Sequence, residues 1–213
     1  MARTLQIKVC GLTREEDVDL TLSLGADYCG LIMYSKSPRG LSLDRARELA
    51  SRVPVGKRVM VDVATDPVDL ARYRDAGFDY FQIHCPVDTD RGTLRAWSQS
   101  VGRERLWLAP RMAPEDPFPV TMLDYADSIL IDTFAKNQVG GTGKVGDWAR
   151  FNLLQAAHPQ THWVLAGGLS PDNVSSAVAS TTAEHLDINS GVESQPGIKD
   201  PAKLREVFRL IRD

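Results

Sequence analysis

The sequence predicts a single-domain (β/α)8 barrel, the TIM-barrel architecture, on three observations. Strand-like and helix-like patterns alternate from one end of the 213-residue chain to the other. Eight such units recur at a spacing of roughly 25 residues, and eight is the number of units in this barrel. No low-complexity segment or interdomain linker interrupts them, so we expect one domain over residues 1–213. A doubly wound open sheet uses the same alternation, usually with five or six strands.

Eight short runs have the apolar and branched character of strands, and helical patterns lie between them. The predicted strands are Leu5–Val9, Tyr28–Met33, Lys57–Val63, Tyr80–His84, Leu106–Ala109, Ser128–Asp132, His162–Ala166 and His185–Ile188. The predicted helices are Arg14–Leu24, Leu43–Ser51, Pro67–Ala76, Gly92–Ser100, Val120–Tyr125, Trp148–Ala157, Pro171–Ala179 and Pro201–Ile211. Four prolines crowd the fifth unit, so its helix should be short or irregular.

Cap signals mark three of the predicted helix starts. Thr13 and Glu16 have the spacing of a capping box. In Asp66-Pro67 and in Ser170-Pro171, a cap residue precedes a proline that suits the first helical position. These signals predict that the helices begin at residues 14, 67 and 171.

Composition and charge limit the classes of partner. A chain of this length with 43% hydrophobic residues can bury a full core. Its net charge of −3 gives no electrostatic reason to expect nucleic acid or an anionic membrane. No apolar run is long enough to span a bilayer, and the N-terminus leads directly into a strand, so we expect no signal peptide. We expect a monomer or a weak homodimer.

The cysteines and histidines favour reduced thiols and no metal site. Cys10, Cys29 and Cys85 have no CxxC spacing and leave one thiol unpaired, which is typical of a cytoplasmic protein. The four histidines lack the spacing of an HExxH motif, so we expect no zinc.

Cys10 and Asp132 are the candidates for acid–base chemistry, because each ends a strand where a barrel places its active residues. A nearby helix start or Lys8 would favour the Cys10 thiolate and lower its pKa. A carboxyl at the barrel mouth can stay partly protonated and donate a proton to a sugar oxygen. Alone, the thiol would be better explained as a packing residue and the carboxyl as a loop cap. Together they suggest proton transfer without a metal or organic cofactor.

Two glycine-containing turns predict a phosphate site. Gly167 and Gly168 follow the seventh strand, and Ser190 and Gly191 follow the eighth. Exposed backbone N–H groups at these two positions of a barrel suit a phosphate monoester. Either turn alone could be ordinary turn chemistry, but the pair favours phosphate.

Three further features are less specific. Arg39 could form a bidentate pair with a substrate carboxylate, or could be a solvated turn residue. Asp187 could orient sugar hydroxyls, or could serve a structural hydrogen bond. The loop Thr133–Asp147 contains a G-x-G-x-x-G match, but a long insertion separates it from its strand. We therefore expect a flap over the substrate rather than a dinucleotide site.

A set of short segments keeps a familiar order along almost the whole chain. The segments are Lys8–Thr13, Gly25–Asp27, Ser37–Arg39, Gln82–His84, Ile131-Asp132, Gly140–Gly143, Asp147-Trp148, Leu165–Leu169, Asn173-Val174, Ser190–Glu193 and Gly197–Asp200. This ordered set resembles the phosphoribosylanthranilate isomerase family of tryptophan biosynthesis. The positions that depart from the family pattern are Tyr34, Asp62, Cys85 and Asn189.

The resemblance implies a cofactor-free Amadori rearrangement. N-(5-phosphoribosyl)anthranilate would become 1-(2-carboxyphenylamino)-1-deoxyribulose 5-phosphate. By the same resemblance, Asp132 is the general acid on the ring oxygen and Cys10 the general base at C2. Arg39 is similar to the residue that engages the anthranilate carboxylate, and the loops at Gly168 and Ser190-Gly191 match the phosphate cradle.

Two alternatives share parts of this pattern. A related sugar-phosphate barrel, such as the histidine-pathway isomerase, resembles a pair of Asp-based half-barrels, and Cys10 argues against it. A phosphosugar-binding barrel without catalysis would keep the phosphate loops but has no need of both Cys10 and Asp132. Assays on both aminoaldose phosphates would separate these possibilities.

Overall fold

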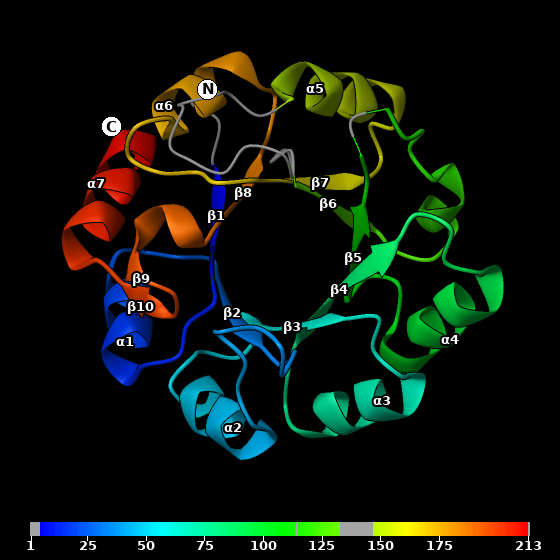
Figure 1. Ribbon diagram of the computed structural model, residues 1–213, viewed down its shortest axis with the longest axis horizontal. Coiled ribbons are helices and arrows are strands. Elements are labelled where there is room, and N and C mark those ends of the chain that lie inside the picture. Colours follow the sequence, from blue (N-terminus) through cyan, green and yellow to red (C-terminus); the bar gives the residue numbers. More distant parts are fainter. Residues whose placement is uncertain (1–4, 114, 133–146, 213) are drawn as a thin grey trace.

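The computed structural model describes residues 5–113, 115–132 and 147–212, and these form the predicted barrel. Eight parallel strands pair in chain order, and β1 pairs with β8 to close the ring (Figure 1). This closure excludes the open-sheet alternative. The strands are β1 (Gln6–Cys10), β2 (Tyr28–Ile32), β3 (Arg58–Val63), β4 (Tyr80–Pro86), β5 (Leu106–Arg111), β6 (Ser128–Asp132), β7 (His162–Ala166) and β8 (His185–Ile188).

Helices surround the strands and confirm the predicted alternation (Figure 1). They are α1 (Glu15–Ser23), α2 (Leu43–Ser51), α3 (Pro67–Asp75), α4 (Arg91–Val101), α5 (Trp148–Ala157), α6 (Val174–Ser180) and α7 (Pro201–Arg212). In the fifth unit the helix is the short 3-10 turn η1 (Val120–Asp124), as the prolines predicted.

One predicted helix start is confirmed and one cap is wrong. Asp66 caps α3 by accepting a hydrogen bond from the Val68 N–H, with a proline at the first turn. The capping box at Thr13 does not form, because its hydroxyl instead donates to the carbonyl of Gly197. The Thr13 side chain therefore makes a hydrogen bond to a residue distant in sequence instead of capping its own helix.

The predicted start of α6 is also wrong. The helix begins at Val174, three residues after the proline expected at its first turn. The side chain of Asn173 accepts from the Ser170 N–H and donates to the Gly168 carbonyl, so a separate turn forms first. The loop after β7 is thereby fixed by its own hydrogen bonds.

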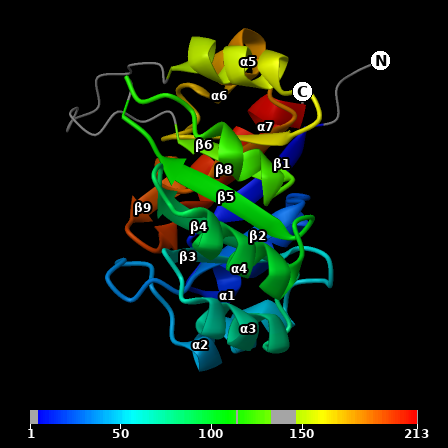
Figure 2. The same cartoon turned by 90° about the vertical axis from the view of Figure 1, so that its right-hand side faces the viewer.

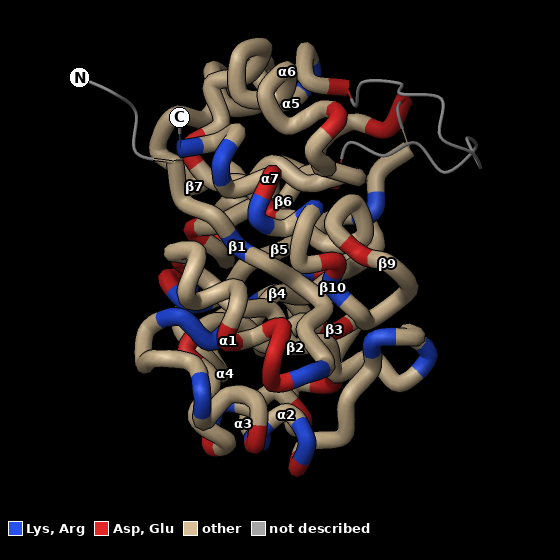
Figure 3. Tube along the Cα trace, turned by 90° about the vertical axis from the view of Figure 1, so that its left-hand side faces the viewer, with Lys and Arg blue, Asp and Glu red and all other residues tan. Residues whose placement is uncertain are grey.

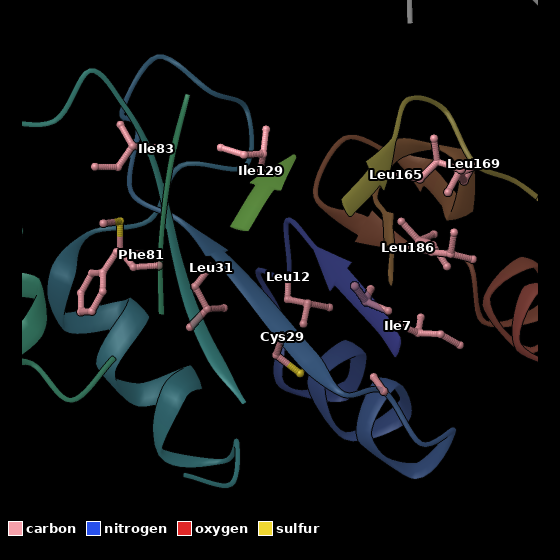
Figure 4. Close-up of a cluster of buried hydrophobic side chains, with 14 of the residues drawn as sticks. Ile7, Leu12, Cys29, Leu31, Phe81, Ile83, Ile129, Leu165, Leu169 and Leu186 are labelled. Atoms are coloured by element: carbon pink, nitrogen blue, oxygen red, sulfur yellow. The ribbon is translucent and has the colours of Figure 1, made fainter. Parts of the chain in front are cut away.

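The side chains of each strand alternate between two cores, as the strand period requires. On β1, Ile7 and Val9 face the helices, whereas Lys8 and Cys10 belong to the inside of the barrel. Figure 4 shows the outer core, where aliphatic side chains of neighbouring strands lie together. The inner core is smaller and includes Ile32, Val59, Val61, Trp107, Ala109, Leu130, Val164 and Ala166.

A small hairpin lies outside the barrel after β8. It follows the 3-10 turn η2 (Ser190–Val192) and consists of the antiparallel strands β9 (Glu193–Gln195) and β10 (Ile198–Lys199). Figure 2 shows β9 projecting from the same end of the barrel as the loop between β2 and α2.

The outer surface is mixed in charge. In the view of Figure 3, acidic and basic residues are interspersed over the helices. Of the helices within the described ranges, none combines the length and apolar character needed to cross a bilayer.

Candidate active site

A pocket of about 230 Å³ opens at the carboxyl ends of the barrel strands. It brings Cys10 and Asp132 together in one cavity, as their positions at strand ends predicted. Other predicted residues line it as well, whereas Arg39 and Gly191 lie just outside. The lining is Cys10, Ile32, Val61, Gln82, His84, Leu130, Asp132, Ala166, Gly167, Gly168, Asp187, Asn189 and Ser190. The predicted flap, 133–146, falls outside the described residues.

Cys10 reaches the pocket because Gly30 on the next strand has no side chain. A Cβ at Gly30 would lie 2.9 Å from the Cys10 Sγ and 3.1 Å from the Lys8 Cε. Any other residue there would displace the thiol or the lysine stem. The sequence offered a signal for this, since a glycine inside a strand often marks a close approach of another group.

The predicted low pKa of the thiol is wrong in direction for the free protein. Cys10 is only 3% exposed, and burial raises the pKa of its thiol above the ordinary value. The ammonium of Lys8 lowers this pKa in part but does not outweigh the burial. The strand pattern predicted the lysine beside the thiol, but it could not predict the desolvation.

Lys8 and Asp187 form a buried ion pair, of which Asp187 lines the pocket. The Lys8 Nζ lies 2.8 Å from the Asp187 Oδ1, and both side chains are almost wholly shielded from solvent. Burial by itself lowers the pKa of Lys8, but Asp187 and Cys10 outweigh it and the pKa is raised. A fixed positive charge therefore stands beside the thiol. The predicted structural bond of Asp187 exists, and the residue also lines the cavity.

Asp132 occupies the last position of β6 and is exposed at the barrel mouth. Its strand partner is Ala166, so the carboxyl stands next to the loop that begins at Gly167. The acid candidate and one of the two predicted phosphate loops are thus neighbours on adjacent strands.

The two predicted phosphate loops pack tightly on each other. Gly167 and Gly168 have φ values of 108° and 63°, which favour glycine. A Cβ at Gly191 would lie 2.1 Å from the Leu169 carbonyl oxygen, so a glycine is required where the loops meet. Gly168 and Ser190 are exposed beside the pocket, which leaves their backbones accessible to a ligand.

Arg39 is held by a protein carboxylate. Its Nε donates to the Glu193 Oε1 at 2.8 Å, and its Nη2 donates to Oε2. Its Cδ lies 2.6 Å from where a Cβ would stand on Gly11, so the side chain passes over the residue that follows Cys10. The fork geometry predicted for a substrate carboxylate is therefore seen here with Glu193.

The sequence reasoning gave no role to two residues of the site, although both lie in the segment Gln82–His84 that carries part of the family resemblance. Gln82 and His84 line the pocket from β4, with the Gln82 Nε2 and His84 Nε2 atoms 3.0 Å apart. Burial, followed by the charge of Lys8, lowers the pKa of His84 to about 4, so its ring is neutral near pH 7. Their alternation on one strand face was the available signal.

Three positions that depart from the family pattern have distinct surroundings. Cys85 is fully buried in the outer core, and burial raises its pKa to about 11. Asp62 accepts from the Val63 N–H and the Thr65 hydroxyl. Asn189 lines the pocket and accepts from the Lys199 Nζ. All three cysteines are free thiols, as predicted.

Comparisons with known proteins find one family along almost the whole chain. The model of the N-(5'-phosphoribosyl)anthranilate (PRA) isomerase family matches residues 7–209. An N-(5'-phosphoribosyl)anthranilate isomerase from Pseudomonas paraeruginosa is 38% identical, over 98% of this chain and 95% of that protein.

Solved structures of the same name have the same fold. A phosphoribosyl anthranilate isomerase in complex with reduced 1-(o-carboxyphenylamino)-1-deoxyribulose 5-phosphate is 27% identical, with a TM-score of 0.75 over 96% of this chain and 97% of that one. Monomers generated from the dimeric isomerase of Thermotoga maritima are 28% identical, with a TM-score of 0.76 over 97% of both chains.

Proposed function

This chain belongs to the N-(5'-phosphoribosyl)anthranilate isomerase family, and we propose that it catalyses that isomerisation through Cys10 and Asp132. The substrate would be N-(5-phosphoribosyl)anthranilate and the product 1-(2-carboxyphenylamino)-1-deoxyribulose 5-phosphate. The observation that carries the proposal is the shared pocket. A thiol, a carboxyl and two exposed glycine loops line one cavity at the catalytic end of the barrel.

Asp132 is the general acid of the first step. It gives its proton to the furanose ring oxygen while the bond between that oxygen and C1 breaks, which leaves a Schiff base at C1. Its exposed position at the end of β6 allows the carboxyl to reach a sugar whose phosphate lies on the loop at Gly167.

Cys10 is the general base of the second step. It removes the proton from C2, and the electron pair of that bond gives an enolamine that tautomerises to the ketone. The thiolate is the form that accepts a proton, and the ammonium of Lys8 is the charge that favours it. Asp187 holds that ammonium in place and faces the pocket, where it can also bind a sugar hydroxyl.

The phosphate of the substrate would be held by the loops after β7 and β8. Gly167 and Gly168 supply backbone N–H groups from one side, and Ser190 and Gly191 complete the cradle from the other. The contact between Gly191 and Leu169 fixes the two loops relative to each other.

A turnover assay tests the proposal. The purified protein is given freshly generated N-(5-phosphoribosyl)anthranilate, and conversion to the ketose is followed; the aminoaldose phosphate of the histidine pathway serves as the competing substrate. We expect turnover of the first substrate. Binding of the phosphosugar without turnover, or a preference for the second substrate, would reject the proposal.

A further inference from the structure

Glu193 is a carboxylate that the proposed chemistry does not use, although its partner Lys199 also contacts Asn189 in the lining of the pocket. It opens the hairpin β9–β10, and its side chain is only 4% exposed. Burying a carboxylate is unfavourable unless cations and hydrogen bonds compensate. Glu193 has both, because Arg39 and Lys199 contact it and the Gly197 N–H donates to it.

Lys199 connects this carboxylate to the loop after β8. Its Nζ is fully shielded and lies 3.0 Å from the Glu193 Oε1. The same Nζ donates to the Asn189 backbone carbonyl at 3.2 Å and to its side-chain oxygen at 3.0 Å. Because Asn189 lines the pocket immediately before Ser190, a single carboxylate joins the loop of Arg39 to the phosphate loop.

The contact with Glu193 leaves half of the Arg39 guanidinium for another partner. A guanidinium offers two edges that match a carboxylate, the Nε–Nη2 edge and the Nη1–Nη2 edge. Glu193 takes the first, and in the described part of the chain no acceptor contacts Nη1. The free edge is held in one orientation, since the bidentate contact fixes the plane of the group.

We propose that Glu193 is a positioning residue that orients the free Nη1–Nη2 edge of Arg39 toward the carboxylate of the substrate. Through its contact with Lys199, Glu193 also connects Arg39 to the predicted phosphate loop. This inference rests on the proposed function, which supplies a substrate with a carboxylate at one end and a phosphate at the other. Because Arg39 and the predicted phosphate loop are both held through the Glu193 carboxylate, the distance between these two binding groups is fixed. This distance selects the length of the substrate.

The first test is Glu193→Gln, which preserves the size of the side chain and removes one charged oxygen. We expect KM for the substrate to rise about tenfold while kcat changes less than about threefold, because an anchor that binds ground and transition states equally affects KM alone. The matched control is Glu206→Gln. That residue makes the same bidentate contact with Arg209 on the exposed face of α7, and its loss should leave KM unchanged.

A double-mutant cycle separates positioning from a general effect on folding. If Glu193 acts through Arg39, Glu193→Gln should raise KM much less in an Arg39→Ala background than in the wild-type protein. Equal fold-changes in both backgrounds would overturn the proposal. An unchanged KM in the single variant would also overturn it.

A third measurement does not depend on turnover, so that failure of the proposed function can be recognised by itself. The ¹H–¹⁵N signal of the Arg39 Nε, assigned by its loss in Arg39→Lys, should be sharp and slow to exchange in the wild type and broadened in Glu193→Gln. Absence of turnover in the wild type would reject the function alone. An Arg39 signal that is the same in both proteins would reject the positioning.

Discussion

The two ends of the barrel interior are built from the same strands with opposite chemistry. At the amino ends, Tyr28 stacks on His185 with ring centroids 5.0 Å apart and packs edge-on against Trp107 at 5.1 Å. At the carboxyl ends stand the Lys8–Asp187 ion pair and the thiol of Cys10. One end is an aromatic plug, and the other is a polar cavity.

The change in side-chain size along each strand explains the difference. Two residues further along β2, Tyr28 gives way to Gly30, and on β5 Trp107 gives way to Ala109. Loss of this volume opens the pocket, while the rings below fill the interior of the barrel. If the proposed function is right, the polar layer carries the chemistry and the aromatic layer carries stability, so mutations in the two layers should have separable effects.

The largest expected effect is a loss of activity on substitution of the acid and base candidates at the polar end of the barrel. Asp132→Asn and Cys10→Ala should each lower kcat by about 10²–10⁴-fold, the usual contribution of a positioned acid or base. The melting temperature should hardly change, since neither substitution alters the aromatic layer. Steady-state kinetics and thermal unfolding measure both quantities. Retention of near wild-type kcat by either variant would show that the assigned role is wrong.

The converse experiment removes a large side chain from the aromatic end of the barrel. Trp107→Ala should lower the free energy of unfolding by about 3–5 kcal/mol, because it removes a large buried ring and leaves a cavity. At a temperature where the variant is folded, kcat and KM should stay close to wild type. Urea unfolding and kinetics on the same preparation test this. A large fall in kcat would mean that the two layers are coupled.

A smaller effect is the loss of stability at acidic pH that the buried His185 should cause. Burial, with the charge of Lys8, lowers the pKa of His185 to about 3, whereas an unfolded histidine titrates near 6.5. Between these two pH values His185 binds a proton in the unfolded chain but not in the folded one. Its contribution to the free energy of unfolding is therefore complete above pH 6.5 and is lost as the pH falls toward 3.

The corresponding variant is His185→Phe, which keeps the stacked ring. It should reduce the loss of unfolding free energy between pH 7 and pH 5 by about 2 kcal/mol. His84 at the polar end will contribute an acid dependence of the same sign, since its pKa is also lowered. Urea unfolding at the two pH values measures the change, and an unaltered difference would contradict the burial of a neutral His185.

The smallest effect concerns the thiol of Cys85, which the proposed chemistry does not use. Cys85 faces the helices, and burial raises its pKa to about 11, so it should resist alkylation at pH 7. Cys85→Ala should cost about 1 kcal/mol of stability and leave kcat unchanged. Mass spectrometry after treatment with a small alkylating reagent, with and without the substitution, tests this. Rapid modification of Cys85 in the folded protein would contradict it.

Local features of the sequence were sufficient for the architecture and for most of the pocket. The alternation of strand and helix patterns predicted the barrel, and the ends of β1 and β6 predicted that Cys10 and Asp132 would meet. These predictions succeed because strand period and parallel closure follow from the backbone alone. The proline-rich fifth unit became a 3-10 turn for a reason equally local.

Contacts between distant residues decided the rest. Lys8 and Asp187 are 179 positions apart, and Arg39 and Glu193 are 154 apart. No local pattern indicates which charges will be paired once β1 and β8 close the ring. The sequence by itself therefore determined which residues stand at the mouth of the barrel. Only the tertiary structure decided that the thiol has a raised pKa and that Arg39 is already held, because desolvation and pairing depend on every group packed around a charge.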